Sequence, residues 1–188
     1  MRRSDPAGAW GSDRPPPCDS PMDIRSALRS QYHAALKALR LAVEQCPDDK
    51  WNDPQDGPAA FWRVAYHALF FTHFYLQDDQ HSFKPWSRHR PDADCLGKLA
   101  WENNREPAPC EPSTRADILD YLRECGRFVD ERVGAMDLDA PTCGFPWYPM
   151  PKLEHQLVNI RHIQHHAAAL SSRLRREAGV GVAWVGRA

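Results

Sequence analysis

Apolar residues recur at intervals of three and four along four stretches of the chain, and this period is typical of amphipathic helices. The first stretch predicts a helix from Ile24 to Cys46. Asp23 can cap its N-terminus, and Pro47 should end it because a residue before proline disfavours helical backbone. Its apolar face comprises Ile24, Leu28, Tyr32, Leu36, Leu39 and Val43.

The second stretch predicts a helix that begins near Pro58, a favourable first-turn residue, and ends at about Gln77. One stripe of this helix contains Ala60, Val64, His67, Phe71 and Phe74. Further apolar surface around the axis comes from Trp62, Leu69 and Phe70. We therefore expect the helix to be largely buried, with His67 on an interior stripe.

Two more helices are predicted in the second half of the chain. One is capped by Ser113 or Thr114 and fades near Met136. Its apolar face comprises Ile118, Tyr121, Leu122, Cys125, Phe128, Val129 and Val133. The other runs from about Lys152 to Ala178. Its expected core positions are Leu153, Leu157, Ile160, Ile163, Leu170 and Leu174.

The segments between and around these helices are less regular. Residues 1–21 are rich in Pro, Gly, Ser and Asp and are expected to form a disordered tail before a single domain over 22–188. Residues 81–113 contain five prolines, with a short helix expected around Cys95–Glu102; this stretch could be a lid or pocket wall, or a plain crossover. The last ten residues should be a loop that packs Trp184 on the helices. The pattern predicts an all-α fold, a four-helix bundle with one long crossover.

Composition removes several classes of function. The chain of 188 residues has 24 basic and 25 acidic side chains, and this balance argues against a nucleic-acid partner. The local cluster of Arg173, Arg175 and Arg176 lies where basic residues complement a helix dipole. No apolar run is long enough to span a membrane, and the N-terminus lacks the apolar core of an export signal. The six cysteines form no C-x-x-C pair, so we expect mostly free thiols in a cytoplasmic protein.

Histidines carry the candidate chemistry. His162 and His166 lie four apart on the last predicted helix, so they project to one side, about 40° and about 6 Å apart. Such a pair can hold one metal ion, as in other helical two-histidine motifs. The best third ligand is His67, since a lone buried imidazole would need hydrogen-bond partners to offset its desolvation. A hydrogen-bonded core histidine remains the alternative for His67.

The other histidines are less informative. His165 is expected at the surface or behind the ligands, and His155 is expected to be a solvated first-turn residue, although it could line a pocket mouth. His73 should point to a different side of its helix from His67. No pattern is evident for His33, His81 and His89.

Two segments resemble the DinB/YfiT-like superfamily of bacterial four-helix proteins. They are FWRVAYHALFFTHFYL at 61–76 and NIRHIQHHAAALSSRLR at 159–175, within a resemblance that covers about residues 23–188. Smaller matches are PSTRADILDYL, FPW at 145–147 and WVGR at 184–187. The second segment is similar to the family's H-x3-H element, which is often followed by a small residue and Gln. Here three alanines, 167–169, follow instead.

The resemblance implies more than the residue pattern does. It implies an up-down-down-up bundle with a long crossover, often dimeric, with His67, His162 and His166 as the metal triad. The family includes thiol-dependent enzymes that use bacillithiol, mycothiol or related cofactors in transfer and isomerisation, and many members without a known activity. A homodimer is therefore among our expectations.

Three neutral imidazoles would leave a divalent ion, zinc or nickel, with an open coordination position. Bound water there would support hydrolysis, and a bound thiolate would support attack on a small-molecule electrophile. No cysteine is near the triad by spacing, so the thiol would be a low-molecular-weight cosubstrate. No general base is evident: Glu154, Asp78 and Asp79 are the nearest acids considered. A non-catalytic metal- or small-molecule-binding protein, connected with stress, and a bundle without metal are the alternatives.

Aromatic residues could shape an apolar pocket beside such an ion, although an aromatic stripe at helical spacing more often belongs to the core. The residues concerned are Trp62, Tyr66, Phe83, Trp86 and Trp147. The sequence leaves both readings open.

Overall fold

The computed structural model describes residues 23–53, 60–99 and 102–188, and its regular structure is helical. Its helices are α1 (Ile24–Gln45), α2 (Asp48–Trp51), α3 (Phe61–Tyr75), α4 (Arg115–Ala135) and α5 (Lys152–Ala178). Within the described ranges there is no strand, only an isolated β-bridge between Leu99 and Arg105. The all-α prediction is confirmed. The predicted tail over 1–21 and the predicted helix start at Pro58 lie outside the described residues.

Local chemistry explains where the long helices begin and end. The Asp23 carboxylate accepts hydrogen bonds from the amides of Arg25 and Ser26, as a helix N-cap does. Thr114 and Asp117 form a reciprocal capping box at the start of α4. Helix α5 ends at Gly179, whose φ of +68° is left-handed and favours glycine.

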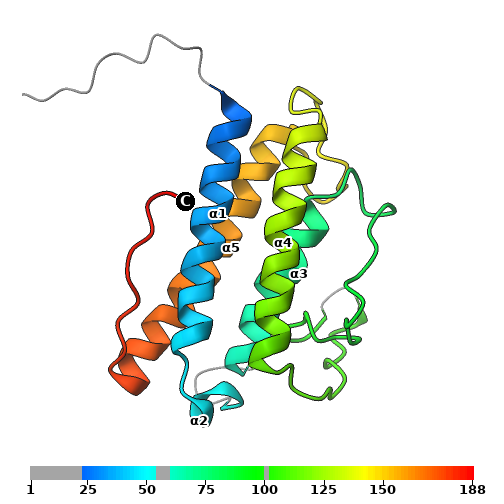
Figure 1. Cartoon of the computed structure of the whole chain (residues 1–188). Coiled ribbons are helices and arrows are strands. Elements are labelled where there is room, and N and C mark those ends of the chain that lie inside the picture. Colours follow the sequence, from blue (N-terminus) through cyan, green and yellow to red (C-terminus); the bar gives the residue numbers. More distant parts are fainter. Residues whose placement is uncertain (1–22, 54–59, 100–101) are drawn as a thin grey trace, which may run out of the picture.

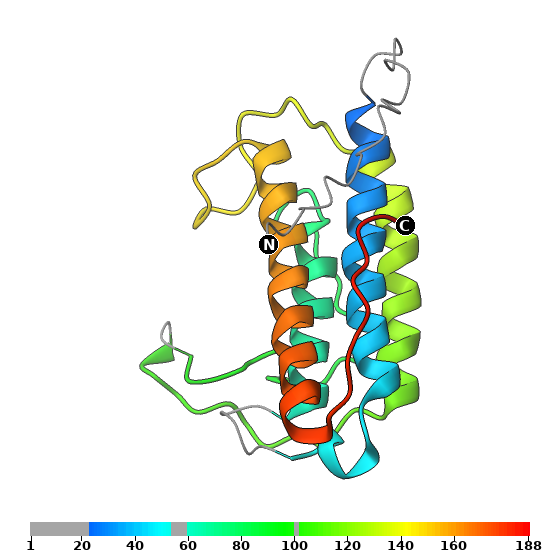
Figure 2. The same cartoon turned by 90° about the vertical axis from the view of Figure 1, so that its left-hand side faces the viewer.

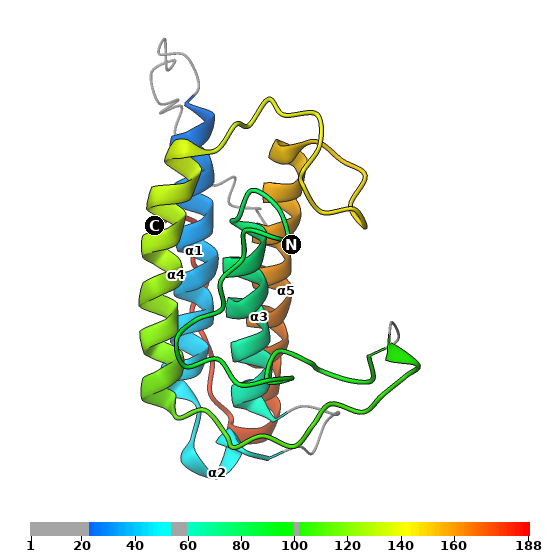
Figure 3. The same ribbon diagram turned by 90° about the vertical axis from the view of Figure 1, so that its right-hand side faces the viewer.

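The four long helices lie side by side, and α1 and α3 each pack against both α4 and α5 (Figure 1). Helices α1 and α5 run from top to bottom in that view, whereas α3 and α4 run from bottom to top. The C-terminal segment after α5 returns alongside α1, where the Gln31 side chain donates to the carbonyl of Gly186 (Figure 2). The segment between α3 and α4 passes over the outer side of α3 (Figure 3).

The core lies between these helices and follows most of the predicted apolar positions. On α1 the buried residues include Leu28, Tyr32, Leu36, Leu39 and Val43, as predicted. On α4 they are Ile118, Tyr121, Leu122, Cys125, Val129 and Val133. Tyr32 is fully buried and donates through its hydroxyl to the side-chain oxygen of Gln156 on α5, 2.7 Å away. A polar bridge thus crosses the core between two neighbouring helices.

The stripe of α3 that contains His67 is not the interior stripe that the sequence suggested. Its five members, at 60, 64, 67, 71 and 74, are only partly buried. The deepest face of α3 instead comprises Phe61, Ala65, Ala68, Leu69 and Thr72, each with no exposed surface. The apolar surface of α3 is so broad that periodicity alone could not choose between these faces. Partial exposure leaves His67 accessible from outside the helices.

Three smaller expectations are also wrong. Trp184 is 81% exposed, because neighbouring valines of the C-terminal segment, including Val182 and Val185, make the core contacts instead. Leu157 is 50% exposed on the outer side of α5. The described part of 95–102 forms no α-helix, and Leu99 instead forms a β-bridge with Arg105. None of the helices in the described ranges has the length and apolar character that a membrane crossing requires.

Candidate metal centre

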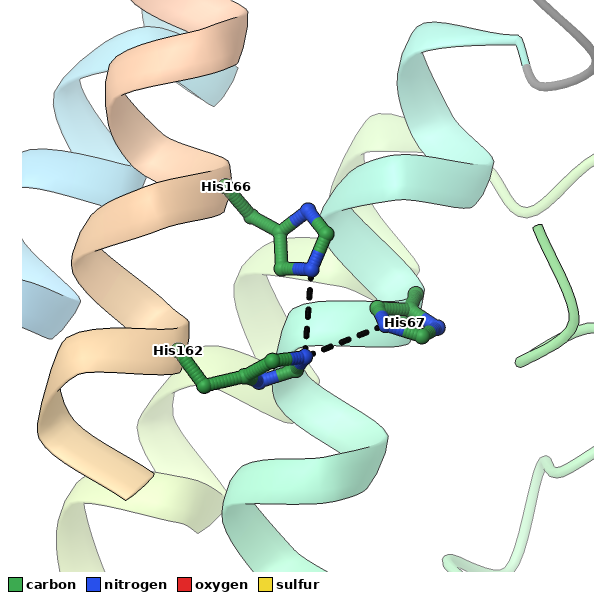
Figure 4. Close-up of side chains that lie close together, drawn as sticks. All are labelled: His67, His162 and His166. Carbon is green, nitrogen blue, oxygen red and sulfur yellow. Dashed lines mark hydrogen bonds between the residues drawn. The ribbon is translucent and has the colours of Figure 1, made fainter. Parts of the chain in front are cut away.

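Three histidines from two helices converge at the half-buried seam between α3 and α5 (Figure 4). His67 comes from α3, and His162 and His166 come from successive turns of α5. The Nε2 atom of His162 lies 3.1 Å from Nε2 of His67 and 3.1 Å from Nε2 of His166. All three nitrogens lie within 4.8 Å of one another. The structure therefore brings together the three residues that the sequence singled out.

The crossover between α3 and α4 fixes the orientation of His67. The backbone carbonyl of Asp94 lies 2.6 Å from Nδ1 of His67. Because a carbonyl only accepts, Nδ1 must carry the proton, and in the neutral ring Nε2 then presents a lone pair to the other histidines. A carbonyl partner behind a histidine is the usual arrangement at protein metal sites.

The environment keeps all three rings neutral near pH 7. Burial, together with the charges of the neighbouring histidines, lowers the pKa of His162 to about 4 and that of His166 to about 3. Burial also lowers the pKa of His67, although its hydrogen bond to the Asp94 carbonyl opposes the shift. Neutral imidazole is the form that binds metal ions.

The donor set fits a divalent ion. A tetrahedral zinc ion with Zn–N bonds of about 2.0–2.1 Å holds its ligand nitrogens about 3.3 Å apart. The two separations from Nε2 of His162, 3.1 Å each, are close to this value. Hydrogen bonding alone cannot satisfy the cluster. If Nε2 of His162 donates to the lone pair of His67, it has no lone pair left for His166. A cation would satisfy all three nitrogens at once.

Aromatic rings flank one side of the cluster. Phe71 lies one turn after His67, with ring centroids 4.7 Å from His67 and 5.6 Å from His162. Of the aromatic residues that the sequence offered for a pocket, Trp62 and Tyr66 are buried in the core. Trp86 lines a cavity of about 790 Å³ beside His73 and Phe128, and none of the three clustered histidines lines it.

The remaining histidines lie in varied surroundings. His165 is exposed, as expected, with its ring 5.0 Å from that of His166. His73 faces α4, where its Nδ1 lies 3.2 Å from the Tyr121 hydroxyl. His155 contradicts the expectation of a solvated residue: it is fully buried, and neither ring nitrogen has a hydrogen-bond partner among the described residues. The loop before α5 covers it with Phe145 and Tyr148.

The sequence interpretation missed the contribution of Asp94. Its carbonyl holds His67, and its carboxylate raises the pKa of that histidine electrostatically, so the side chain is near the cluster. No periodic pattern marks a crossover residue whose backbone atom makes the contact. Glu154 and Asp78 are exposed, and no described side-chain carboxylate is hydrogen-bonded to the three histidines.

The structure is thus that of an all-α protein in which three histidine nitrogens from two helices could hold one metal ion. The family model of the DinB superfamily matches residues 31–170, a range that contains all three histidines. The chain belongs to the DinB superfamily. Neither the curated proteins nor the solved structures contain a significant match to it.

Proposed function

We propose that this protein binds one divalent metal ion through His67, His162 and His166 and acts as a metal-dependent enzyme on a small-molecule electrophile. The convergence of three neutral Nε2 atoms at a half-buried seam carries the proposal. Zinc or nickel suits an all-nitrogen donor set. Three protein ligands leave room for a further ligand, as at catalytic rather than structural zinc sites.

The ion would supply Lewis acidity for a bound water or thiolate. The chain's own contribution is to hold three imidazoles neutral and to place Phe71 as an apolar wall beside them. Thiol transfer and hydrolysis are both compatible with this arrangement. In thiol transfer, the thiol would come from a low-molecular-weight cosubstrate, since neither crossover cysteine, Cys95 or Cys110, is among the hydrogen-bond partners of the three histidines. Burial also raises the pKa of Cys95 to about 11.

The family resemblance extends the proposal to the architecture. We infer one domain over 22–188 with an up-down-down-up four-helix bundle and a long crossover after α3. The helix directions in Figure 1 support this topology. A cytoplasmic location is supported by the five described cysteines, all of which are unpaired. A homodimer is expected from the resemblance and can be tested by sedimentation.

Elemental analysis of the untagged protein tests metal binding directly. We expect about one zinc or nickel ion per chain in the wild type and none in His162→Ala. His165→Ala is the matched control, because it removes an exposed histidine of the same helix turn. Full occupancy in His162→Ala, or a metal-free wild type after reconstitution with either ion, would refute the proposal.

Catalysis needs a separate assay with the metal-loaded protein. A panel that pairs low-molecular-weight thiols with electrophiles, together with an ester panel, should reveal turnover that disappears in His162→Ala. The absence of a hydrogen-bonded carboxylate at the cluster favours the second candidate, a non-catalytic metal- or small-molecule-binding protein. Stoichiometric metal without turnover in either panel would support that candidate.

A further inference from the structure

One stripe of α5 collects buried polar atoms that have no partner. The stripe contains His155, Asn159, His162 and His166, whose spacings of four, three and four keep them on one side of the helix. Both ring nitrogens of His155, Oδ1 of Asn159 and Nδ1 of His162 are buried without a hydrogen bond among the described residues. Such orphaned atoms are uncommon and expensive in folded proteins, so each calls for an explanation.

The unpartnered atom of His162 is Nδ1, the ring nitrogen that must carry the proton when Nε2 binds the metal. A neutral histidine that binds an ion through Nε2 carries its proton on Nδ1, and that proton needs an acceptor. His67 already has one in the carbonyl of Asp94. In Figure 4, Nδ1 of His162 lies on the side of its ring away from His166, toward the preceding turn of α5. An acceptor for His162 should therefore come from that turn.

Asn159 is the residue of that turn on the same stripe. It lies three positions before His162, where side chains on a helix are neighbours. Its Nδ2 atom donates to the carbonyl of Thr72, 3.2 Å away, and this contact fixes which end of the amide is the oxygen. The free Oδ1 atom is an acceptor without a donor, and Nδ1 of His162 is a donor without an acceptor.

We propose that Asn159 is a positioning residue of the metal site. Its Oδ1 and Nδ1 of His162 are not hydrogen-bonded to each other in this structure, and on metal binding Oδ1 would accept the hydrogen bond of His162 Nδ1–H. The inference rests on the proposed metal binding. Asn159 does not touch the ion; it fixes the tautomer and the ring orientation of His162 and makes Nε2 a better donor to the metal. The carbonyl of Asp94 accepts from Nδ1 of His67 on α3, and Asn159 would accept from Nδ1 of His162 on α5. One ligand of each helix would then have a hydrogen-bond partner at Nδ1.

Other buried groups on this side of α5 cannot take the role. His155 lies seven positions before His162, about 10 Å along the axis, which is too far for a hydrogen bond. Its ring packs against Tyr75 and Phe145 instead. The side-chain oxygen of Gln156 already accepts from the Tyr32 hydroxyl at 2.7 Å.

Gln156 provides a closely matched control. Like Asn159, it is fully buried on α5, and its amide nitrogen donates to a backbone carbonyl of α3, that of Tyr75, also at 3.2 Å. The two amides differ in their oxygens, because only that of Asn159 lacks a partner. Replacing Asn159 with Leu removes its one core hydrogen bond to a carbonyl, and replacing Gln156 with Leu removes two core hydrogen bonds, but only the first replacement should affect the metal site.

The experiment measures the zinc affinity of the full chain by competition with a chromophoric chelator. We expect Asn159→Leu to weaken zinc binding roughly 10–100-fold, the usual effect of losing such a partner. Asn159→Asp keeps an acceptor oxygen and should restore most of the affinity, and Gln156→Leu should stay within about threefold of the wild type. The visible spectrum of the cobalt-substituted protein should change in Asn159→Leu alone.

The possible results separate the two proposals. If the wild type binds no zinc, the proposed metal site fails. If it binds zinc and Asn159→Leu binds equally well, or Gln156→Leu is weakened as much, only the inference about Asn159 is overturned. Should Asn159→Leu not fold, NMR of the zinc-bound wild type decides. A slowly exchanging His162 Nδ1–H signal with an NOE to the Asn159 amide supports the inference, and a rapidly exchanging proton contradicts it.

Discussion

The two ends of the seam between α3 and α5 both contain buried polar residues, but they use them differently. At one end, which we call the open end, the ring nitrogens of His162 and His166 converge with that of His67 at a half-buried surface. At the other end, which we call the closed end, His155 is fully buried without a hydrogen-bond partner among the described residues, and the Lys152 ammonium donates to three backbone carbonyls. Convergence from a second helix and access from outside, rather than burial, distinguish a candidate metal site.

The loop before α5 accounts for the difference. It folds over the start of α5 and brings Cys143 and Phe145 into a small core of their own with Tyr75. The backbone comes so close to the end of α3 that a Cβ atom at Gly144 would lie 2.0 Å from the carbonyl oxygen of Asp78. At the histidine triad the described residues leave His67 and His162 partly exposed, and the crossover contributes the carbonyl of Asp94 to one side.

The largest expected effect is a loss in the free energy of unfolding when Lys152 at the closed end is replaced. Lys152→Met should lower the free energy of unfolding by about 3–5 kcal/mol, because it leaves the carbonyls of Gln77, Asp78 and Cys143 without their donor. Denaturant unfolding of the metal-free protein measures this loss. Lys37→Met, at an exposed position of α1, should stay within about 0.5 kcal/mol. A zinc affinity altered more than tenfold in Lys152→Met would show that the two ends are coupled.

The second-largest expected effect is the gain in the free energy of unfolding when zinc binds at the open end. At a free concentration 100 times the dissociation constant, zinc should add about 2.7 kcal/mol to the free energy of unfolding of the wild type. The same zinc concentration should leave His162→Ala unchanged and should still stabilise His165→Ala. Thermal unfolding with and without a chelator provides the comparison. Equal stabilisation of His162→Ala would place the zinc elsewhere.

Low pH should lower the free energy of unfolding through the buried His155 at the closed end. Burial, aided by the nearby Lys152 charge, lowers the pKa of His155 to about 4, against about 6.5 in an unfolded chain. Between these values only the unfolded state takes up the proton, so stability falls as the pH falls, by about 1.4 kcal/mol per pH unit for this residue. Above about pH 6.5 it has no effect. The metal-free His155→Phe variant should show a correspondingly shallower pH dependence from pH 6.5 to 4, and an unchanged slope would contradict the prediction.

The smallest effect is expected for the same variant at pH 7. His155→Phe removes two buried nitrogens without partners and keeps an aromatic ring against Tyr75 and Phe145. We expect a gain of about 1 kcal/mol in the free energy of unfolding, because the desolvation cost of the nitrogens disappears. A loss of more than about 1 kcal/mol would indicate that His155 has a polar partner in solution.

Periodicity predicted the long helices well because each has an apolar face and several of their ends have a local signal. The cap at Asp23, the capping box at Thr114 and the glycine after α5 are local features that tertiary packing did not override. Prediction failed where two apolar faces competed, as on α3. It also failed for Trp184, since nothing local distinguishes an exposed tryptophan in a terminal segment from a buried one.

Sequence by itself determined the helical register, and with it the shared side of His162 and His166, because a spacing of four fixes geometry on any α-helix. It also singled out His67 as the best third ligand, although the stripe that contains His67 is partly exposed and not interior as predicted. Only the tertiary structure decided that α3 lies beside α5 in the register that brings their histidine nitrogens within 3.1 Å. The carbonyl of Asp94, the burial of His155 and the orphaned oxygen of Asn159 were likewise beyond prediction. Each depends on which segments pack together, and contacts between residues so distant in sequence follow from packing rather than from local pattern.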